Sequence, residues 1–219
     1  MAAPPAVDFY YGLGSRYSYL AATRIAGLEA ETGCRVRWRP LYSADLFAAR
    51  GADPFQGQPV SGQYDWAWRR ADAEAWADYY GVPYREPDDV RFEGRRLALA
   101  ATAAGRLGAL ERFSRRLFEA IFVLGLSPVD DAALRDIAGE VGLDQAGFAA
   151  LLDDPETATV LERTLQEALA AGIFGVPSFV LGGRVFWGND RLALVRHRLL
   201  QGQRPNQRKR GSTQSGAAP

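Results

Sequence analysis

The chain has 219 residues, 47% of them hydrophobic, which is enough for one domain with a sizeable core. Its 26 basic and 26 acidic residues give a formal net charge of zero, so the composition predicts neither nucleic acid nor an anionic membrane as a partner. The only lysine is Lys209, the only cysteine Cys34 and the only histidine His197, which excludes a P-loop, a dithiol redox pair and a zinc site of the usual kind.

No targeting or membrane segment is recognisable. Residues 1–5 lack a basic region followed by a long apolar stretch, as a signal peptide would have. No run approaches the roughly 20 apolar residues of a membrane span. These features predict a soluble, cytoplasmic protein.

The first elements are a strand, a tight turn, a helix and a second strand. Residues 7–11 are mostly β-branched or aromatic and predict a buried strand. Gly12 and Gly14 permit the turn, and apolar residues at helical spacing predict a helix over 17–31. A second strand is predicted at 36–41. Because a helix carries the chain back between them, the two strands are expected to be parallel.

The long middle of the chain, residues 43–171, predicts helices almost throughout. It is rich in alanine, with apolar residues three and four positions apart. Two stretches with Gly and Pro, 51–62 and 81–89, predict loops between helices. Helices are expected over 43–50, 63–80, 94–106, 107–123, 131–142, 146–153 and 155–171.

Strand signals return after this block. Residues 177–181 and 184–187 flank Gly182 and Gly183, a pattern that predicts a β-hairpin, and a closing helix follows over 191–200. The order β-α-β, then β-β-α, is that of an α/β thioredoxin-like fold interrupted by an all-helical insertion. The expected organisation is a thioredoxin-like domain (6–42 plus 172–201), an inserted helical subdomain (43–171) and a disordered tail (202–219).

Ser15 falls where the first helix begins, and two interpretations of it are open. As an N-cap, its hydroxyl satisfies a backbone donor of the first turn and has no other role. Alternatively, the hydroxyl and the unpaired N–H groups of that turn form an electropositive cradle for an anion, beside the charge of Arg16. Residues 12–17 also imitate half of a dinucleotide fingerprint. That match is rejected, because the third glycine and a ribose-binding acid are missing.

Pro177 stands immediately before the third predicted strand. In a thioredoxin-like order this is where a cis peptide bond lies, and a cis Val176–Pro177 bond would turn the backbone groups of Val176 toward Ser15. Those groups could then pair with the backbone of a bound peptide, as an added strand does. The alternative is an ordinary trans proline at the start of a strand.

Five motifs occur together. They are Asp8-Phe-Tyr, Ser-x-Tyr-Ser-Tyr-Leu-Ala at 15–21, Trp76-Ala with Tyr80-Gly-Val-Pro83, Phe174-Gly-Val-Pro-Ser-Phe and Phe186-Trp-Gly-Asn-Asp-Arg191. Together they resemble the motifs of the 2-hydroxychromene-2-carboxylate isomerases, which are similar to kappa-class glutathione transferases. The resemblance covers about residues 7–200.

The resemblance implies a site for glutathione as cofactor. Ser15 would hold the glutathione thiolate in the place of a redox cysteine. Val176, followed by cis Pro177, would pair with the backbone of the tripeptide. The γ-glutamyl end would be bound by Gly188, Asn189, Asp190 and Arg191.

The side chains of residues 188–191 suit this implied role. Asp190 can pair with an α-ammonium group, while Arg191 and backbone amides suit a carboxylate. The alternative is a turn in which Asn189 or Asp190 only caps the last helix. Capping and ligand binding are compatible at one helix start.

The residues expected around the second, aromatic substrate differ in part from the family pattern. Arg16 stands where a proline usually follows the serine, and Gly14 replaces a bulkier residue. Arg95 and Arg96 resemble a paired-arginine motif of the substrate side, whereas Ala98 stands where an asparagine is expected. Arg95 and Arg96 are predicted as substrate residues from this resemblance, and Arg16 is predicted as one because it stands beside Ser15.

The function implied is a glutathione-dependent cis–trans isomerase of an aromatic 2-oxo acid. The thiolate held by Ser15 would add reversibly to a conjugated double bond of this small-molecule partner. One alternative is a kappa-like glutathione transferase or peroxidase, and another is a non-catalytic thiol- or peptide-binding module. No metal is predicted, and a homodimer is compatible with the resemblance.

Overall fold

The computed structural model describes residues 4–51, 65–89 and 91–203, and a four-stranded sheet lies at its centre. β1 and β2 are parallel because helix α1 (Arg16–Thr32) carries the chain back between them. β3 is antiparallel to both β1 and β4. The strands, in the spatial order β2-β1-β3-β4, are β1 (Ala6–Tyr11), β2 (Arg35–Pro40), β3 (Ser178–Leu181) and β4 (Arg184–Trp187).

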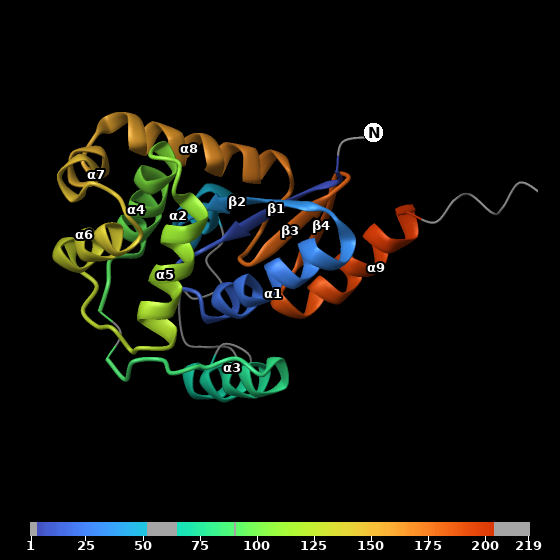
Figure 1. The fold of residues 1–219 in the computed structure, drawn as a ribbon. Helices are drawn as coiled ribbons and strands as arrows, with labels where there is room; N and C mark the ends of the chain where they lie inside the picture. Colours follow the sequence, from blue (N-terminus) through green and yellow to red (C-terminus); the bar gives the residue numbers. More distant parts are fainter. Residues whose placement is uncertain (1–3, 52–64, 90, 204–219) are drawn as a thin grey trace, which may run out of the picture.

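Alternation along β1 divides its side chains between the two faces of the sheet. Phe9 and Tyr11 belong to the large hydrophobic core on the face covered by α1 and α9 (Leu192–Gln203). Tyr10 packs in a second cluster with residues of α8 (Pro155–Ala170) on the opposite face. The sheet is therefore the middle of three layers, with α8 on one side and α1 and α9 on the other (Figure 1).

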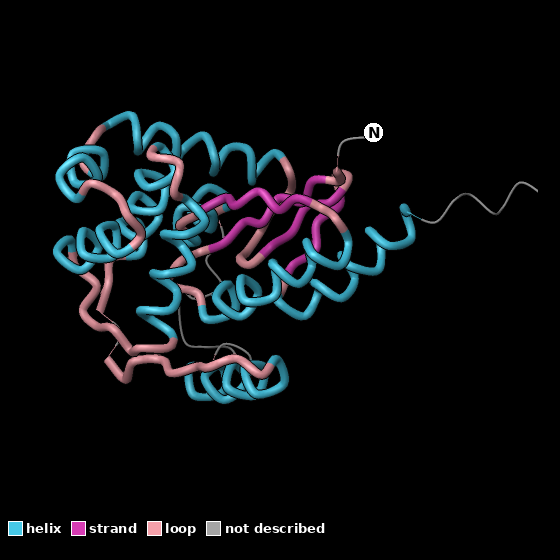
Figure 2. The backbone as a smooth tube through the Cα atoms, in the orientation of Figure 1, coloured by secondary structure: helices cyan, strands magenta, loops and turns pink. Residues whose placement is uncertain are grey.

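The described residues between β2 and β3 are mostly helical, as predicted. Figures 1 and 2 show α4 to α7 gathered beside the sheet, whereas α3 lies alongside α1. The helices of this block before α8 are α2 (Ser43–Arg50), α3 (Trp66–Tyr80), α4 (Gly94–Arg106), α5 (Leu110–Phe122), α6 (Asp131–Glu140) and α7 (Gln145–Leu152).

The helical block and the sheet share one core. The hydroxyls of Tyr11 on β1 and Ser114 on α5 are 2.7 Å apart and buried. The ring of Tyr11 also lies 5.8 Å from that of Phe118, on the same helix. Each fully buried aromatic side chain stabilises the folded state by about 1.5–3 kcal/mol. β1 and α5 therefore stabilise each other.

The predicted thioredoxin-like order of strands and helices is confirmed. Glycine marks the ends of elements where a left-handed backbone is required: Gly33 ends α1 with φ 63°, and Gly182 and Gly183 form the hairpin turn. The helix predicted from 107 begins at Leu110 instead. Gly108 has φ 71° and breaks the helical path between α4 and α5.

Some predictions fall wholly or partly outside the described residues. They concern residues 52–62 of the predicted loop, the first residues of the helix predicted over 63–80, and residues 204–219 of the predicted tail. The two preceding residues of that tail, 202 and 203, instead end α9. In the part of the chain that is described, no helix combines the length and apolarity needed to cross a membrane.

Candidate functional site

Ser15 stands between the carboxyl end of β1 and the first turn of α1. Its backbone is extended (φ −100°, ψ 116°), and its Oγ accepts a hydrogen bond of 3.2 Å from the N–H of Ser18, so Ser15 is an N-cap. A hydroxyl has one proton and two lone pairs, so this role leaves the proton free to be donated. Capping therefore does not compete with holding an anion in front of the helix, where the helix dipole also favours negative charge.

The Val176–Pro177 segment lies beside the same turn. The Val176–Pro177 peptide bond, predicted to be cis, has the cis geometry. A Cβ built on Gly12 would lie 3.3 Å from Cγ2 of Val176 and 3.9 Å from Cβ of Ser15, so Gly12 lets the two segments approach closely. Among the hydrogen bonds of the described residues, none uses the backbone N–H or C=O of Val176. Both groups are therefore available to a ligand.

Residues 188–191 are attached to this segment through the sheet. The N–H of Gly188 donates a 2.9 Å hydrogen bond to the carbonyl of Pro177. Gly188 has φ 112°, a backbone that L-residues rarely adopt, and it is followed by the 3₁₀ turn Asn189–Arg191. The side-chain amide of Asn189 is buried and donates a hydrogen bond to the hydroxyl of Tyr80. The side chains of Asp190 and Arg191 are accessible, and Nε of Arg191 lies 3.4 Å from Oδ2 of Asp190.

The predicted substrate residue Arg16 is engaged within the protein. Its Nη2 lies 2.7 Å from Oε1 of Glu86, and both side chains are 7% exposed. Its guanidinium also stacks on the ring of Trp66, 5.2 Å from the centroid. The second carboxylate oxygen of Glu86 accepts from the hydroxyl of Tyr84. Arg16 thus anchors the first turn of α1 to residues 84–86.

Arg95 and Arg96 lie at the N-terminus of α4 and are also ion-paired. Nε of Arg95 is 3.1 Å from the carboxylate of Asp45 on α2. Arg96 makes two hydrogen bonds with Asp131 and a further ion pair with Asp153, which ties α4 to α6 and to the end of α7. The structure therefore brings Ser15, Val176 and residues 188–191 together and gives the three arginines partners of their own.

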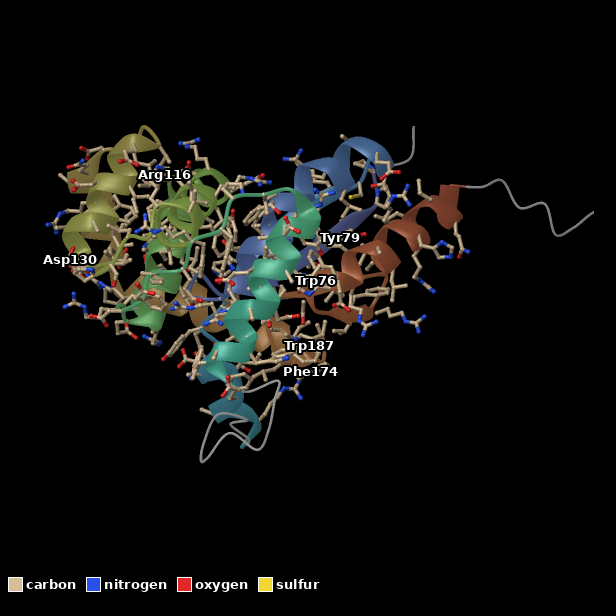
Figure 3. The ribbon with its side chains drawn as sticks, turned by 90° about the horizontal axis from the view of Figure 1, so that it is seen from below. Trp76, Tyr79, Arg116, Asp130, Phe174 and Trp187 are labelled. Carbon is tan, nitrogen blue, oxygen red and sulfur yellow. The ribbon has the colours of Figure 1, made fainter. Side chains whose placement is uncertain are left out.

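Phe92 is a neighbour of the site that the sequence did not suggest. A Cβ built on Gly14 would lie 2.5 Å from the ring of Phe92, so this ring rests directly on the backbone of the turn before Ser15. The exposed rings of Phe174 and Trp187 lie next to each other, with centroids 5.2 Å apart, and form a second aromatic feature (Figure 3). Gly14 is the sequence signal for the contact with Phe92, and Gly175 is the signal for a contact with Trp187, whose Nε1 would lie 2.7 Å from a Cβ there.

Replacing Gly14 by alanine is expected to destabilise the protein by about 1–3 kcal/mol, because the new methyl group overlaps the ring of Phe92. Gly27→Ala in α1 is the matched control. A Cβ at Gly27 meets nothing within 4 Å, and alanine favours a helix over glycine by up to about 1 kcal/mol. Urea denaturation measures the free energy of unfolding of both variants. Equal stability of the two variants would contradict the contact between Gly14 and Phe92.

Redox chemistry through the chain's own thiol has no support in this geometry. Cys34 is buried, and burial raises the pKa of its thiol, which disfavours the reactive thiolate. Ala6 pairs with Arg35, so Cys34 lies at the end of β2 opposite to Ser15. The two side chains cannot act on one substrate atom.

Residues 6–200 match the DSBA-like thioredoxin domain family. The chain belongs to this family. Among the relatives of this DSBA-like protein, the 2-hydroxychromene-2-carboxylate isomerase of Sphingobium xenophagum is 30% identical over 194 residues, which are 89% of this chain and 97% of the relative. The resemblance seen in the motifs is thereby confirmed.

Solved structures of other proteins have the same fold as this DSBA-like protein. A 2-hydroxychromene-2-carboxylate isomerase has a TM-score of 0.79 at 24% identity, and the match covers 90% of this chain and 95% of the other. The cytosolic disulfide reductase DsbM from Pseudomonas aeruginosa, in a structure with GSH, has a TM-score of 0.63 at 19% identity and covers 90% and 98% of the two chains. At these identities the likeness shows the fold alone.

Proposed function

We propose that this protein is a glutathione-dependent isomerase of an aromatic 2-oxo acid, of the kind named 2-hydroxychromene-2-carboxylate isomerase. The observation that supports it most is Ser15, whose hydroxyl caps α1 through a lone pair and keeps its proton to donate. The similarity to named isomerases directs the choice of reaction.

The residues at the site fit a tripeptide thiol. Ser15 and the first turn of α1 suit the thiolate, because a hydroxyl donor and a helix N-terminus both favour the charged form of a thiol. The free N–H and C=O of Val176 suit a peptide backbone. Asp190 and Arg191 remain accessible, and they suit the ammonium and carboxylate groups of the γ-glutamyl end.

In this reaction the protein binds glutathione and lowers the pKa of its thiol. When bound, glutathione supplies a thiolate that adds reversibly to a conjugated double bond and so allows rotation about it. Ser15 keeps the sulfur ionised near neutral pH by donating a hydrogen bond to it. The backbone of Val176 would hold the tripeptide beside the helix, and the ring of Phe92 packs against the turn before Ser15.

Two measurements test the proposal. Calorimetry with glutathione is expected to show one binding site per chain. The absorbance of 2-hydroxychromene-2-carboxylate is expected to change when enzyme and glutathione are both present, and not when either is omitted. Consumption of glutathione with a chlorodinitrobenzene-type electrophile, without isomerisation, would indicate a transferase instead. The absence of thiol binding would contradict every interpretation that assigns a thiol to Ser15.

A further inference from the structure

A cavity lies between α1, α3 and the start of α9, and residues of the 3₁₀ turn also line it. Its volume is about 890 Å³, within the range of ~300–1,000 Å³ that small-molecule sites occupy. Figure 3 shows two of its lining residues, Trp76 and Tyr79, on the side of α3 that faces α9. Ser15 and Val176 do not line it, whereas Asn189 and Asp190, which are assigned to the γ-glutamyl end of glutathione, do.

Small residues on all three helices leave this space open. Gly27 lies in the middle of α1, where glycine costs roughly 1 kcal/mol of helix stability relative to alanine. A Cβ at Gly27 would meet nothing within 4 Å, so close packing does not require the glycine. Ala75 on α3 and Ala193 on α9 line the same space. A larger side chain at any of these positions would reduce the cavity.

One wall of the cavity is aromatic and held in place. The rings of Trp76, Tyr79 and Tyr80 lie 5.3 to 5.7 Å from one another. The hydroxyl of Tyr80 donates to the backbone carbonyl of Asn189 and accepts from its side-chain amide, which fixes the ring. Tyr79 is 78% exposed although it belongs to this cluster. Such a wall suits a planar aromatic ring.

Three acids and two arginines line the cavity, and they differ in the partners they have. Glu31 is paired with Arg196, Asp72 accepts from the hydroxyl of Tyr17, and Asp190 lies beside Arg191. Arg24 is different. Its guanidinium stacks over the ring of Tyr80 at 5.2 Å, and no carboxylate of the described residues lies within ion-pair distance of it. Glu31 and Asp190 thus each have an arginine partner and Asp72 has a neutral hydroxyl, while Arg24 at the aromatic wall has no opposite charge beside it in the described part of the chain and could meet a ligand carboxylate.

We propose that this cavity is a second ligand site, for a small planar aromatic carboxylate. The ring lies against Trp76 and Tyr80, and the carboxylate meets the guanidinium of Arg24. Gly27 supplies the room for the ring. The cavity adjoins the proposed glutathione site at Asn189 and Asp190, which line it, whereas Gly27 at its other end is twelve residues, or about 18 Å, along α1 from Ser15.

The test is calorimetric titration of the thiol-free protein with 2-naphthoate. The wild type is expected to bind one molecule per chain. Gly27→Leu, which fills the cavity with a good helix former, is expected to weaken binding at least tenfold while the thermal midpoint stays equal or rises. Because no thiol is present, the outcome does not depend on the proposed reaction.

The charge is tested with a matched pair of ligands. Arg24→Gln is expected to weaken the binding of 2-naphthoate about fivefold and to leave the binding of neutral 2-naphthamide unchanged. Arg163→Gln removes another exposed arginine, on α8 across the sheet, and is expected to change neither ligand. Lack of 2-naphthoate binding to the wild type, or binding that survives Gly27→Leu undiminished, would overturn the proposal.

Discussion

Replacing Ser15 by alanine is expected to slow glutathione-dependent isomerisation by roughly tenfold to a hundredfold. The variant loses one hydrogen bond to a charged sulfur, which is worth about 1.5–3 kcal/mol if its whole effect reaches the transition state. The affinity for glutathione should fall less, because in the proposed binding mode Val176 and residues 188–191 would still contact the rest of the tripeptide. Initial rates at saturating glutathione, measured with 2-hydroxychromene-2-carboxylate, give the size of the effect.

The control must separate this effect from the loss of a helix cap, since Ser15 also accepts from the N–H of Ser18. Losing a cap alone costs about 0.5–2 kcal/mol of stability. Asp144→Ala removes the equivalent bond, to the N–H of Gly147, at the start of α7 away from the site. It should lower stability to a similar extent and leave the rate unchanged. If Ser15→Ala also left the rate of the folded protein unchanged, Ser15 would be only a cap.

Removing the negative charge of Glu86 should have the largest effect on stability. Glu86→Gln leaves Arg16 charged and buried without its counter-ion, and breaking a buried pair in this way costs about 3–5 kcal/mol. The ion pair at 2.7 Å is 7% exposed on both sides, so water cannot replace the lost partner. The free energy of unfolding from urea denaturation measures the change.

Two further variants show whether the unpaired buried charge causes the loss of stability in Glu86→Gln. Asp88→Asn removes a carboxylate that pairs with Arg70 at 2.9 Å but is 96% exposed, so it should cost no more than about 1 kcal/mol. The double variant Arg16→Met with Glu86→Leu removes both charges and should regain much of the lost stability. A cost for Glu86→Gln no greater than that of Asp88→Asn would contradict a structural role for the pair.

Local patterns predicted much of the fold because the responsible interactions are local. Ser15 and Gly33 mark the two ends of α1 through bonds to backbone groups within one turn. The hairpin between β3 and β4 was predicted because two glycines can take the left-handed conformations that its turn needs. The position of Ser15 beside Val176 followed from the order of elements in a thioredoxin-like sheet.

Side-chain partners distant in sequence could not be predicted in this way. Arg16 is predicted as a substrate residue, and the sequence gives no sign of its partner Glu86, 70 residues further along the chain. Arg96 similarly pairs with Asp131, 35 residues away. A sequence pattern shows that a charge is present and does not show which opposite charge the tertiary fold brings to it. For the same reason, Gly14 predicted a turn and did not identify Phe92 as its neighbour.

The ionisation of the bound thiol tests the central claim most directly. The ultraviolet absorbance of the thiolate, titrated against pH with glutathione bound, reports its pKa in wild type and in Ser15→Ala. A free thiol has a pKa near 8.5, and one pKa unit corresponds to about 1.4 kcal/mol, so a hydrogen bond of 1.5–3 kcal/mol should separate the two proteins by roughly one to two units. A lower pKa in the wild type than in the variant is predicted. The same pKa in both would contradict the role of Ser15 as the group that stabilises the thiolate.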